Sequence, residues 1–443
     1  MKKLLRILFM AVFCSALCLA FSHLTLKNAQ AKFKIDIYAG SGVHKTSMAI
    51  PLLRNLGDKS GPGNLEKDLA DALTDDMMMT GFFDVLPRSI YLENPRIASI
   101  KQGEFNFDDW SVIGSEMLIK GGFVVDGNHI SIEFRLFDVI QRRLIIGKKY
   151  EGNTEDYYRI AHKFSNEIIY TMTGEPGSFG TQVAYTSGGR GRTELYVIDV
   201  DGRNKKKLTR LGGSVDSPAW SPDGKSILFT YAREGERASL WIINADGKNL
   251  KKICEYPGVV LTPAFHPTGK YFILTLSKDG NSELYTMNLD GSDVKRLTNT
   301  WYIEVSPSFS PDGKSLAYAC DRGGQPQIFK MNADGTNAAR ISFVGGYNSD
   351  PSWSPKGDKI AYQSLSGNNF HVYVMNTDGY EVTSFGLGEH PSFSPDGRSI
   401  VISSPRSGGR GLFIINIDGS FIKKLTSGAD NDMSPAWSPR LAD

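Results

Sequence analysis

The sequence contains little cysteine and none of the common motifs of catalysis. Four of its 443 residues are cysteines, and two of these lie in the apolar start of the chain. Cys254 and Cys320 remain, at different positions of a sequence repeat, so we expect no disulfide framework. No nucleophile-elbow, zinc-protease, phosphate-loop or dinucleotide-binding motif occurs. The sequence therefore does not indicate the common hydrolase or nucleotide-binding classes.

An excess of charge of one sign is also missing, because 50 basic residues face 48 acidic ones. The formal net charge of +2 does not indicate a nucleic-acid-binding protein. The lysine run 205–207 has no interleaved aromatic residues and is interpreted as a solvated edge strand. After residue 21 no apolar run approaches the length that crosses a bilayer. We expect a monomer, peripheral to the membrane, that binds no nucleic acid, metal or cofactor.

The start of the chain has the three parts of a secretory signal. Basic residues within the first six positions precede an apolar run over 7–21, and Ala29-Gln30-Ala31 follows as a small-x-small cleavage site. We predict a signal peptide over residues 1–31, cleaved after Ala31, and a periplasmic mature protein. An uncleaved membrane anchor is the alternative, but the apolar run is marginal for spanning about 30 Å of hydrocarbon.

A repeat fills the second half of the chain. The phrase Ser-Pro-x-aromatic-Ser-Pro-Asp-Gly recurs with variation, and its leading prolines are Pro218, Pro263, Pro307, Pro351, Pro391 and Pro435. An Asp-Gly pair alternates with this phrase, at residues 201–202, 246–247, 290–291, 334–335, 378–379 and 418–419. Proline after serine suits a type I turn, and Asp-Gly suits a hairpin turn with positive φ. A period of about 44 residues with four short strands is typical of a β-propeller blade.

The phase of the repeat predicts how the ring closes. The first unit begins with a second strand near residue 183, and the last unit ends with an inner strand at residues 434–439. Pairing the two ends completes a sixth blade and removes both exposed sheet edges. We therefore predict a six-bladed all-β propeller over residues 181–443, after a linker at 174–180.

Residues 32–173 lack the repeat and are predicted to form a small α+β domain. Asn64 could cap a helix that ends near Met79, and a strand is expected over 82–86. Residues 117–125 and 129–139 alternate in polarity around a turn, which predicts a hairpin. A last helix is expected from 155 to 173.

Several residues could suggest chemistry but have simpler interpretations. His266, His371 and His390 are scattered through the repeat and do not form a metal-ligand pattern. Residues 199–202 resemble part of a calcium loop but lack the remaining ligands, so a hairpin turn is the better interpretation. The aromatic residue of each leading phrase recurs once per blade, which favours packing between sheets. A propeller enzyme, a lyase or glycosidase acting at the channel mouth, remains the alternative to a binding protein.

The combination of these features resembles the TolB family of the Tol–Pal envelope system. The resemblance rests on the repeated phrase, on Asp109-Trp110-Ser111-Val112-Ile113-Gly114 and on endings such as Leu289-Asp290-Gly291. It implies a non-catalytic hub whose propeller binds the peptidoglycan-associated lipoprotein Pal and whose amino-terminal strand binds TolA. Such a hub would support outer-membrane integrity and cell division.

The partner site is expected on the propeller loops that precede each leading proline. These loops differ from blade to blade, whereas the turns at the opposite end repeat. The predicted contact residues are Asp216, Val259, Val260, Leu261, Tyr302, Glu304, Val305, Tyr347, Asn348, Glu389 and His390.

A second interaction site is expected in the strand at the start of the mature chain. Its apolar and polar residues alternate, so one face could dock on the protein or pair with a partner strand. Gly40 and Gly42 follow as a hinge. The predicted contact residues are Lys32, Phe33, Lys34, Ile35, Asp36, Ile37 and Tyr38.

Overall fold

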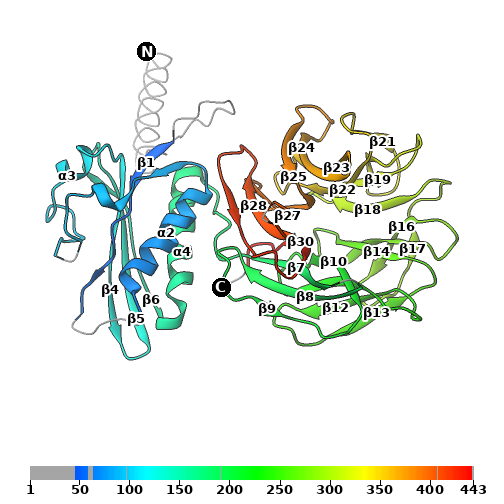
Figure 1. Ribbon diagram of the computed structural model, residues 1–443, viewed down its shortest axis with the longest axis horizontal. Helices are drawn as coiled ribbons and strands as arrows, with labels where there is room; N and C mark the ends of the chain where they lie inside the picture. The colour runs from blue at the N-terminus through cyan, green and yellow to red at the C-terminus, as the bar shows by residue number, and fades with distance from the viewer. Residues whose placement is uncertain (1–44, 58–62, 96, 190, 407, 442–443) are drawn as a thin grey trace, which may run out of the picture.

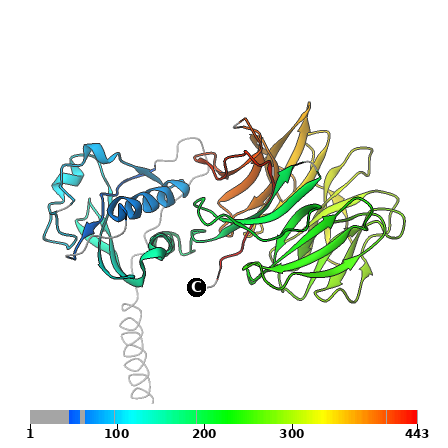
Figure 2. The same ribbon diagram turned by 60° about the horizontal axis from the view of Figure 1, so that its bottom comes forward.

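The computed structural model describes residues 45–57, 63–95, 97–189, 191–406 and 408–441. They form an amino-terminal domain of strands and helices beside a six-bladed β-propeller (Figures 1 and 2), which confirms the expected fold class. The predicted signal peptide and the predicted strand over 32–38 lie outside the described residues. Within the described part of the chain, no helix has the length and apolar character needed to span a membrane.

One mixed six-stranded sheet forms the base of the amino-terminal domain. Its strands are β1 (Thr46–Ala49), β2 (Arg54–Asn55), β3 (Phe83–Val85), β4 (Met117–Asp126), β5 (His129–Asp138) and β6 (Arg143–Asn153). The order is β3-β1-β4-β5-β6, with β2 beside β4. Strand β1 runs parallel to β3 and β4, whereas β4, β5 and β6 are antiparallel. The hairpin predicted from residues 117–139 is thus confirmed as β4 and β5.

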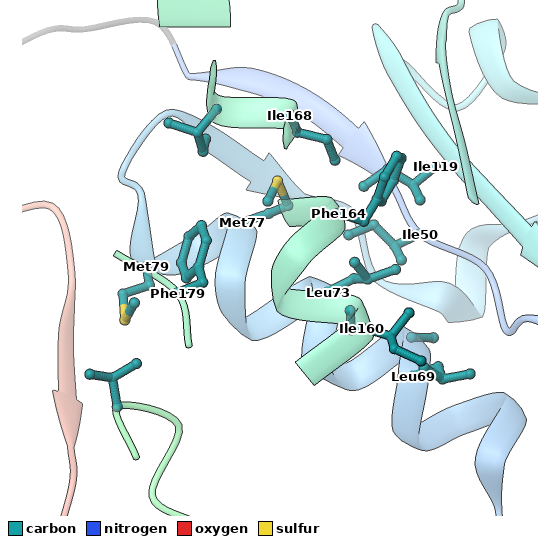
Figure 3. Packing of buried hydrophobic residues seen from close by; sticks show 14 of the residues in the cluster. Ile50, Leu69, Leu73, Met77, Met79, Ile119, Ile160, Phe164, Ile168 and Phe179 are labelled. Carbon is teal, nitrogen blue, oxygen red and sulfur yellow. The ribbon is translucent and has the colours of Figure 1, made fainter. Parts of the chain in front are cut away.

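Two helices, α2 (Leu65–Met79) and α4 (Tyr157–Thr173), pack together against the sheet (Figure 3). The short elements are η1 (Arg88–Ile90), α3 (Asp108–Ser111) and η2 (Thr154–Asp156). Leu69 and Leu73 of α2 are fully buried with Phe164 of α4, whose ring stacks on Phe134 of β5 at 4.8 Å. This apolar layer fixes both helices to the sheet.

Both helices begin close to the predicted positions, but the predicted cap is absent. Asn64 holds the N-cap position of α2, yet its side chain makes no capping hydrogen bond. The backbone carbonyl of Asn64 instead accepts the N–H groups of Lys67 and Asp68, both at 2.9 Å. Helix α4 begins at Tyr157 because the preceding residues form the 3₁₀ turn η2.

The propeller consists of six four-stranded antiparallel sheets. The first three are β10 (Ser214–Trp220), β11 (Ser226–Ala232), β12 (Ser239–Asn244), β13 (Lys251–Glu255); β14 (Val260–Phe265), β15 (Tyr271–Leu276), β16 (Glu283–Asn288), β17 (Lys295–Arg296); and β18 (Glu304–Phe309), β19 (Ser315–Cys320), β20 (Gln327–Asn332), β21 (Ala339–Arg340). The next two are β22 (Asn348–Trp353), β23 (Lys359–Ser366), β24 (Asn369–Asn376), β25 (Thr383–Leu387); and β26 (Glu389–Phe393), β27 (Ser399–Ser404), β28 (Gly411–Asn416), β29 (Ile422–Lys424). The sixth is β30 (Asp432–Trp437), β7 (Gln182–Gly189), β8 (Arg192–Asp199) and β9 (Lys206–Lys207).

The sixth sheet closes the ring with both ends of the repeat region. Strand β30 pairs antiparallel with β7, and Trp437 lies opposite Val183. The Trp437 indole N–H also donates to the Thr181 hydroxyl at 2.8 Å. The predicted pairing of the last inner strand with the first three strands is confirmed.

The once-per-blade aromatic residues pack between sheets, as predicted. Trp220, Phe393 and Trp437 are buried, and the other three are half-buried against apolar clusters. Cys254 and Cys320 lie in different blades as free thiols.

Three of the six Asp-Gly turns, at Gly291, Gly335 and Gly379, lie tightly against the neighbouring blade. A Cβ built on Gly379 would lie 1.9 Å from the carbonyl oxygen of Ile341 in the preceding sheet, and its φ is +93°. Only glycine combines this backbone conformation with so close an approach. At these three positions the Asp-Gly pair therefore forms the turn and also allows the close contact between blades.

Candidate functional site

The two ends of the propeller have different surfaces. One end carries the repeated Pro-Asp-Gly and Asp-Gly turns, and we call it the turn face. The other end carries the connections from each outer strand to the next inner strand, such as 256–259, 297–303 and 341–347, and we call it the loop face. The repeat explains the uniform turn face, and the loop face varies because no turn phrase constrains it.

The amino-terminal domain docks on the turn face of the last two sheets (Figure 2). Lys423, beside the Asp-Gly turn that joins β28 to β29, pairs with Asp75 of α2 at 3.0 Å. The Asp396 N–H, in the turn between β26 and β27, donates to the Ser178 hydroxyl at 3.3 Å. The Arg398 guanidinium lies 4.5 Å from the centre of the Phe82 ring. This docking leaves the loop face uncovered by the described part of the amino-terminal domain.

A narrow central channel is lined by the residue before each leading proline together with the proline. All six residues that precede a proline have φ between 45° and 55°: Ser217, Thr262, Ser306, Asp350, His390 and Ser434. Each lies where the inner strand shifts register with its neighbour, so a β-bulge at every blade forms the channel wall. The cavity within this ring is about 140 Å³.

Polar side chains in the channel bind each other. The Ser434 hydroxyl donates to Asp216 at 2.6 Å, and the Ser306 hydroxyl donates to Asp350 at 2.5 Å. His390 Nδ1 lies 3.3 Å from the other Asp350 oxygen. Burial disfavours both charges, but the ion pair outweighs it, so the pKa of His390 lies above its ordinary value and the pKa of Asp350 below.

The channel is small, and its two aspartate carboxyls already have hydrogen-bond partners. The channel is smaller than the 300–1,000 Å³ range typical of small-molecule sites. The carboxyls of Asp216 and Asp350 are each engaged by a serine hydroxyl. Among the described residues no cluster of three or more His, Cys, Asp or Glu could hold a metal ion.

The predicted propeller contact residues lie at the loop face and along the channel, but most are strand residues. Val259, Tyr302 and Tyr347 lie in loops, whereas the other eight belong to the first half of an inner strand. Val260, Glu304 and Asn348, each the third residue before a leading proline, are buried. These three could affect a partner only through their neighbours, and Tyr302 has the largest exposed fraction of the predicted set, 40%.

Sequence reasoning missed the most exposed aromatic residue of the loop face. Trp301 is 97% exposed in the segment 297–303, next to Tyr302, and Ile303 is 48% exposed. The Arg322 guanidinium lies 5.3 Å from the centre of the Tyr302 ring. Trp301, Tyr302 and Ile303 are three consecutive apolar residues outside both repeated phrases, and this feature of the sequence could have indicated an exposed apolar site. The predicted amino-terminal contact residues lie outside the described part of the chain.

The fold is a six-bladed propeller with an uncovered loop face, joined to a small domain of strands and helices. Family models match both parts: "TolB beta propeller domain" over residues 169–441 and "TolB amino-terminal domain" over 33–145. The chain belongs to the TolB family.

Relatives and solved structures agree with this assignment. The chain is 35% identical over 193 residues to "Tol-Pal system protein TolB" of Desulfosudis oleivorans, covering 44% of each chain. It is 42% identical over 187 residues to the protein of the same description from Geobacter metallireducens, covering 42% of this chain and 43% of that one. These matches span less than half the length of the curated relatives. The structure is similar to TolB from Acinetobacter baumannii, with a TM-score of 0.78 and 25% identity over 90% of this chain and 97% of that chain.

Proposed function

We propose that the protein is a non-catalytic interaction hub of the Tol–Pal system in the periplasm. Its propeller binds the peptidoglycan-associated lipoprotein Pal, and its amino-terminal strand binds TolA, in support of outer-membrane integrity and cell division. The descriptions of the curated relatives support the Tol–Pal role. The observation that supports the propeller site most strongly is the uncovered loop face with Trp301 exposed on it.

Trp301 and Tyr302 have the properties of interface anchors. Large aromatic side chains dominate binding energy because they bury much apolar area at a small cost in conformational entropy. Loss of one such anchor at the centre of an interface weakens binding by about 1–4 kcal/mol. Trp301, Tyr302 and Ile303 are exposed side by side, and together they offer apolar surface that a partner can bury.

Calorimetric titration with the periplasmic domain of Pal tests this proposal. We expect the Trp301→Ala variant, and separately the double variant Tyr302→Ala with Tyr347→Ala, to bind Pal at least about tenfold more weakly. Leu289→Ala is the matched control, since Leu289 is 39% exposed at the turn-face end of the same sheet as the Trp301 loop. Unchanged Pal affinity in both loop-face variants would refute this placement.

For the amino-terminal strand, alternation of Phe33, Ile35 and Ile37 with polar residues supports pairing with a partner strand. Deleting 32–38 from the mature chain should abolish TolA binding and change Pal affinity several-fold. The propeller's thermal midpoint should stay nearly constant, because its six sheets are built from strands β7 to β30. An unchanged TolA titration would contradict the proposal, and a lower midpoint would indicate a structural role instead.

A further inference from the structure

Two buried carboxyl groups meet beneath the segment that carries Trp301. Glu283 is the first residue of β16 and Glu304 is the first residue of β18, and their exposed fractions are 0% and 1%. The Glu304 carboxyl lies within hydrogen-bonding reach of the Glu283 carboxyl. The Oε2 atom of each has no donor group among the described residues. Because two carboxylates cannot bond to each other without a proton, the pair is satisfied when one proton is shared between them.

Among the described residues, the pair has one cationic contact. Arg296 of β17 donates to Glu283 Oε1 at 2.9 Å. Tyr318 and Cys320 of β19 face Glu304, and burial, with a smaller contribution from its charge, raises the pKa of both. Burial, with the neighbouring Glu283 carboxyl, raises the pKa of Glu304 to about 7, although hydrogen bonds with the Thr298 and Thr300 hydroxyls oppose the rise. The shared proton therefore leaves near neutral pH.

The next blade has an uncharged version of the same contact. Gln327 and Asn348 occupy the equivalent first positions of β20 and β22, and both are buried. The Asn348 side-chain amide donates to Gln327 Oε1 at 2.8 Å. The blade contact can thus be made by amides, which do not titrate. Packing at this position therefore does not require two acids. Unlike the amide pair, the carboxyl pair can gain or lose a proton.

The carboxyl pair holds the Trp301 segment through Thr300. The Thr300 N–H donates to Glu283 Oε1 at 2.8 Å, and the Thr300 hydroxyl donates to Glu304 Oε1 at 3.3 Å. The Tyr302 N–H in turn donates to the Thr300 hydroxyl at 3.1 Å. Thr300 therefore connects both acids to the residues on either side of the exposed indole. Loss of the shared proton places two buried carboxylates in contact, and their repulsion is relieved when one of them moves.

We propose that protonation of the Glu283–Glu304 pair controls the conformation of segment 299–303 and so the presentation of Trp301 on the loop face. At acidic pH the shared proton keeps Thr300 bound to β16 and β18. Above neutral pH these contacts are lost, while Asn281 and Asp321 continue to bind Tyr302 and Ile303. The effect on a partner rests on the proposed function. If Pal binds only the protonated form, its affinity falls by up to about tenfold for each pH unit above 7.

The conformational part can be tested without any partner. Indole ¹H–¹⁵N spectra are recorded between about pH 5.5 and about pH 8.5, and the Trp301→Phe variant assigns the Trp301 signal. We expect this signal to shift in the wild type with a midpoint near pH 7. The double variant Glu283→Gln with Glu304→Asn, which copies the amide pair of the next blade, should show no such shift. Glu255→Gln, an exposed glutamate of β13, is the control and should titrate like the wild type. The same midpoint in the double variant would overturn the proposal.

The consequence for binding is measured as Pal affinity at about pH 6 and about pH 8. We expect the wild type to bind about tenfold more weakly at the higher pH and the double variant to bind equally at both. Equal wild-type affinities would overturn the proposed control of binding. Absence of binding at either pH would refute the proposed function instead, and the Trp301 titration would then decide the conformational proposal alone.

Discussion

Replacing His162 with glutamine removes a buried cation that joins the two domains. His162 of α4 lies between two carboxylates: its Nδ1 is 2.8 Å from Asp76 of α2, and its Nε2 is 3.3 Å from Asp201, in the turn after β8. His162 and Asp76 are each only 4% exposed. Burial alone would lower the pKa of His162, but the two carboxylates outweigh it and raise the pKa to about 10. The imidazole is therefore charged at neutral pH.

The expected loss of stability follows from this pKa. A rise from the ordinary value of 6.5 to about 10 corresponds to about 5 kcal/mol between the two protonation states. Removing one partner of a buried ion pair costs about 3–5 kcal/mol, because the remaining charge stays buried. We expect His162→Gln to lower the free energy of unfolding by about 3–5 kcal/mol near pH 6. Asp75→Asn, which removes the exposed contact with Lys423 in the same interface, should cost less than about 1 kcal/mol.

The assay is guanidinium unfolding followed by circular dichroism at several pH values. Because the folded-state pKa lies above the unfolded-state value, the contribution of His162 is fully present below about pH 6.5. It is lost as pH rises through about 10, so the difference between wild type and His162→Gln should shrink over that interval. A variant no less stable than Asp75→Asn near pH 6, or a difference that stays constant up to about pH 10, would refute the reasoning.

Two further predictions concern blade packing and the amino-terminal core. In chemical denaturation, Gly379→Ala should lower the free energy of unfolding by at least about 3 kcal/mol, because the new Cβ meets the Ile341 carbonyl. Gly419 has a φ of +75° but open space around it, so Gly419→Ala should lower the free energy of unfolding by about 1–2 kcal/mol. Lys120 and Glu93 form a buried ion pair, so Glu93→Gln should cost about 3–5 kcal/mol, while the double variant Glu93→Leu with Lys120→Met, which leaves no charge behind, stays within about 1 kcal/mol. Equal losses in either pair of variants would contradict these expectations.

The propeller could be predicted because its information is local and repeated. Each Asp-Gly and Pro-Asp-Gly pair specifies a turn within a few residues, and six copies separate this signal from chance. The amino-terminal sheet was harder to predict. Strand β1 has four residues and pairs only with distant strands, in parallel, so no turn marks it. Strand β6 is an edge strand with many exposed positions, so its apolar alternation is weak.

The sequence by itself determined the period, the number of blades and the closure of the ring, since turn chemistry and strand alternation act over short distances. Only the tertiary structure decided which face the amino-terminal domain covers and that Trp301 is fully exposed on the other. It also brought Glu283 and Glu304 together across 21 positions, and His162 to Asp201 across the domain interface. Such pairs form only when blades and domains pack together, and burial then sets the pKa of each group. A local sequence pattern therefore predicts neither the pairing nor the pKa.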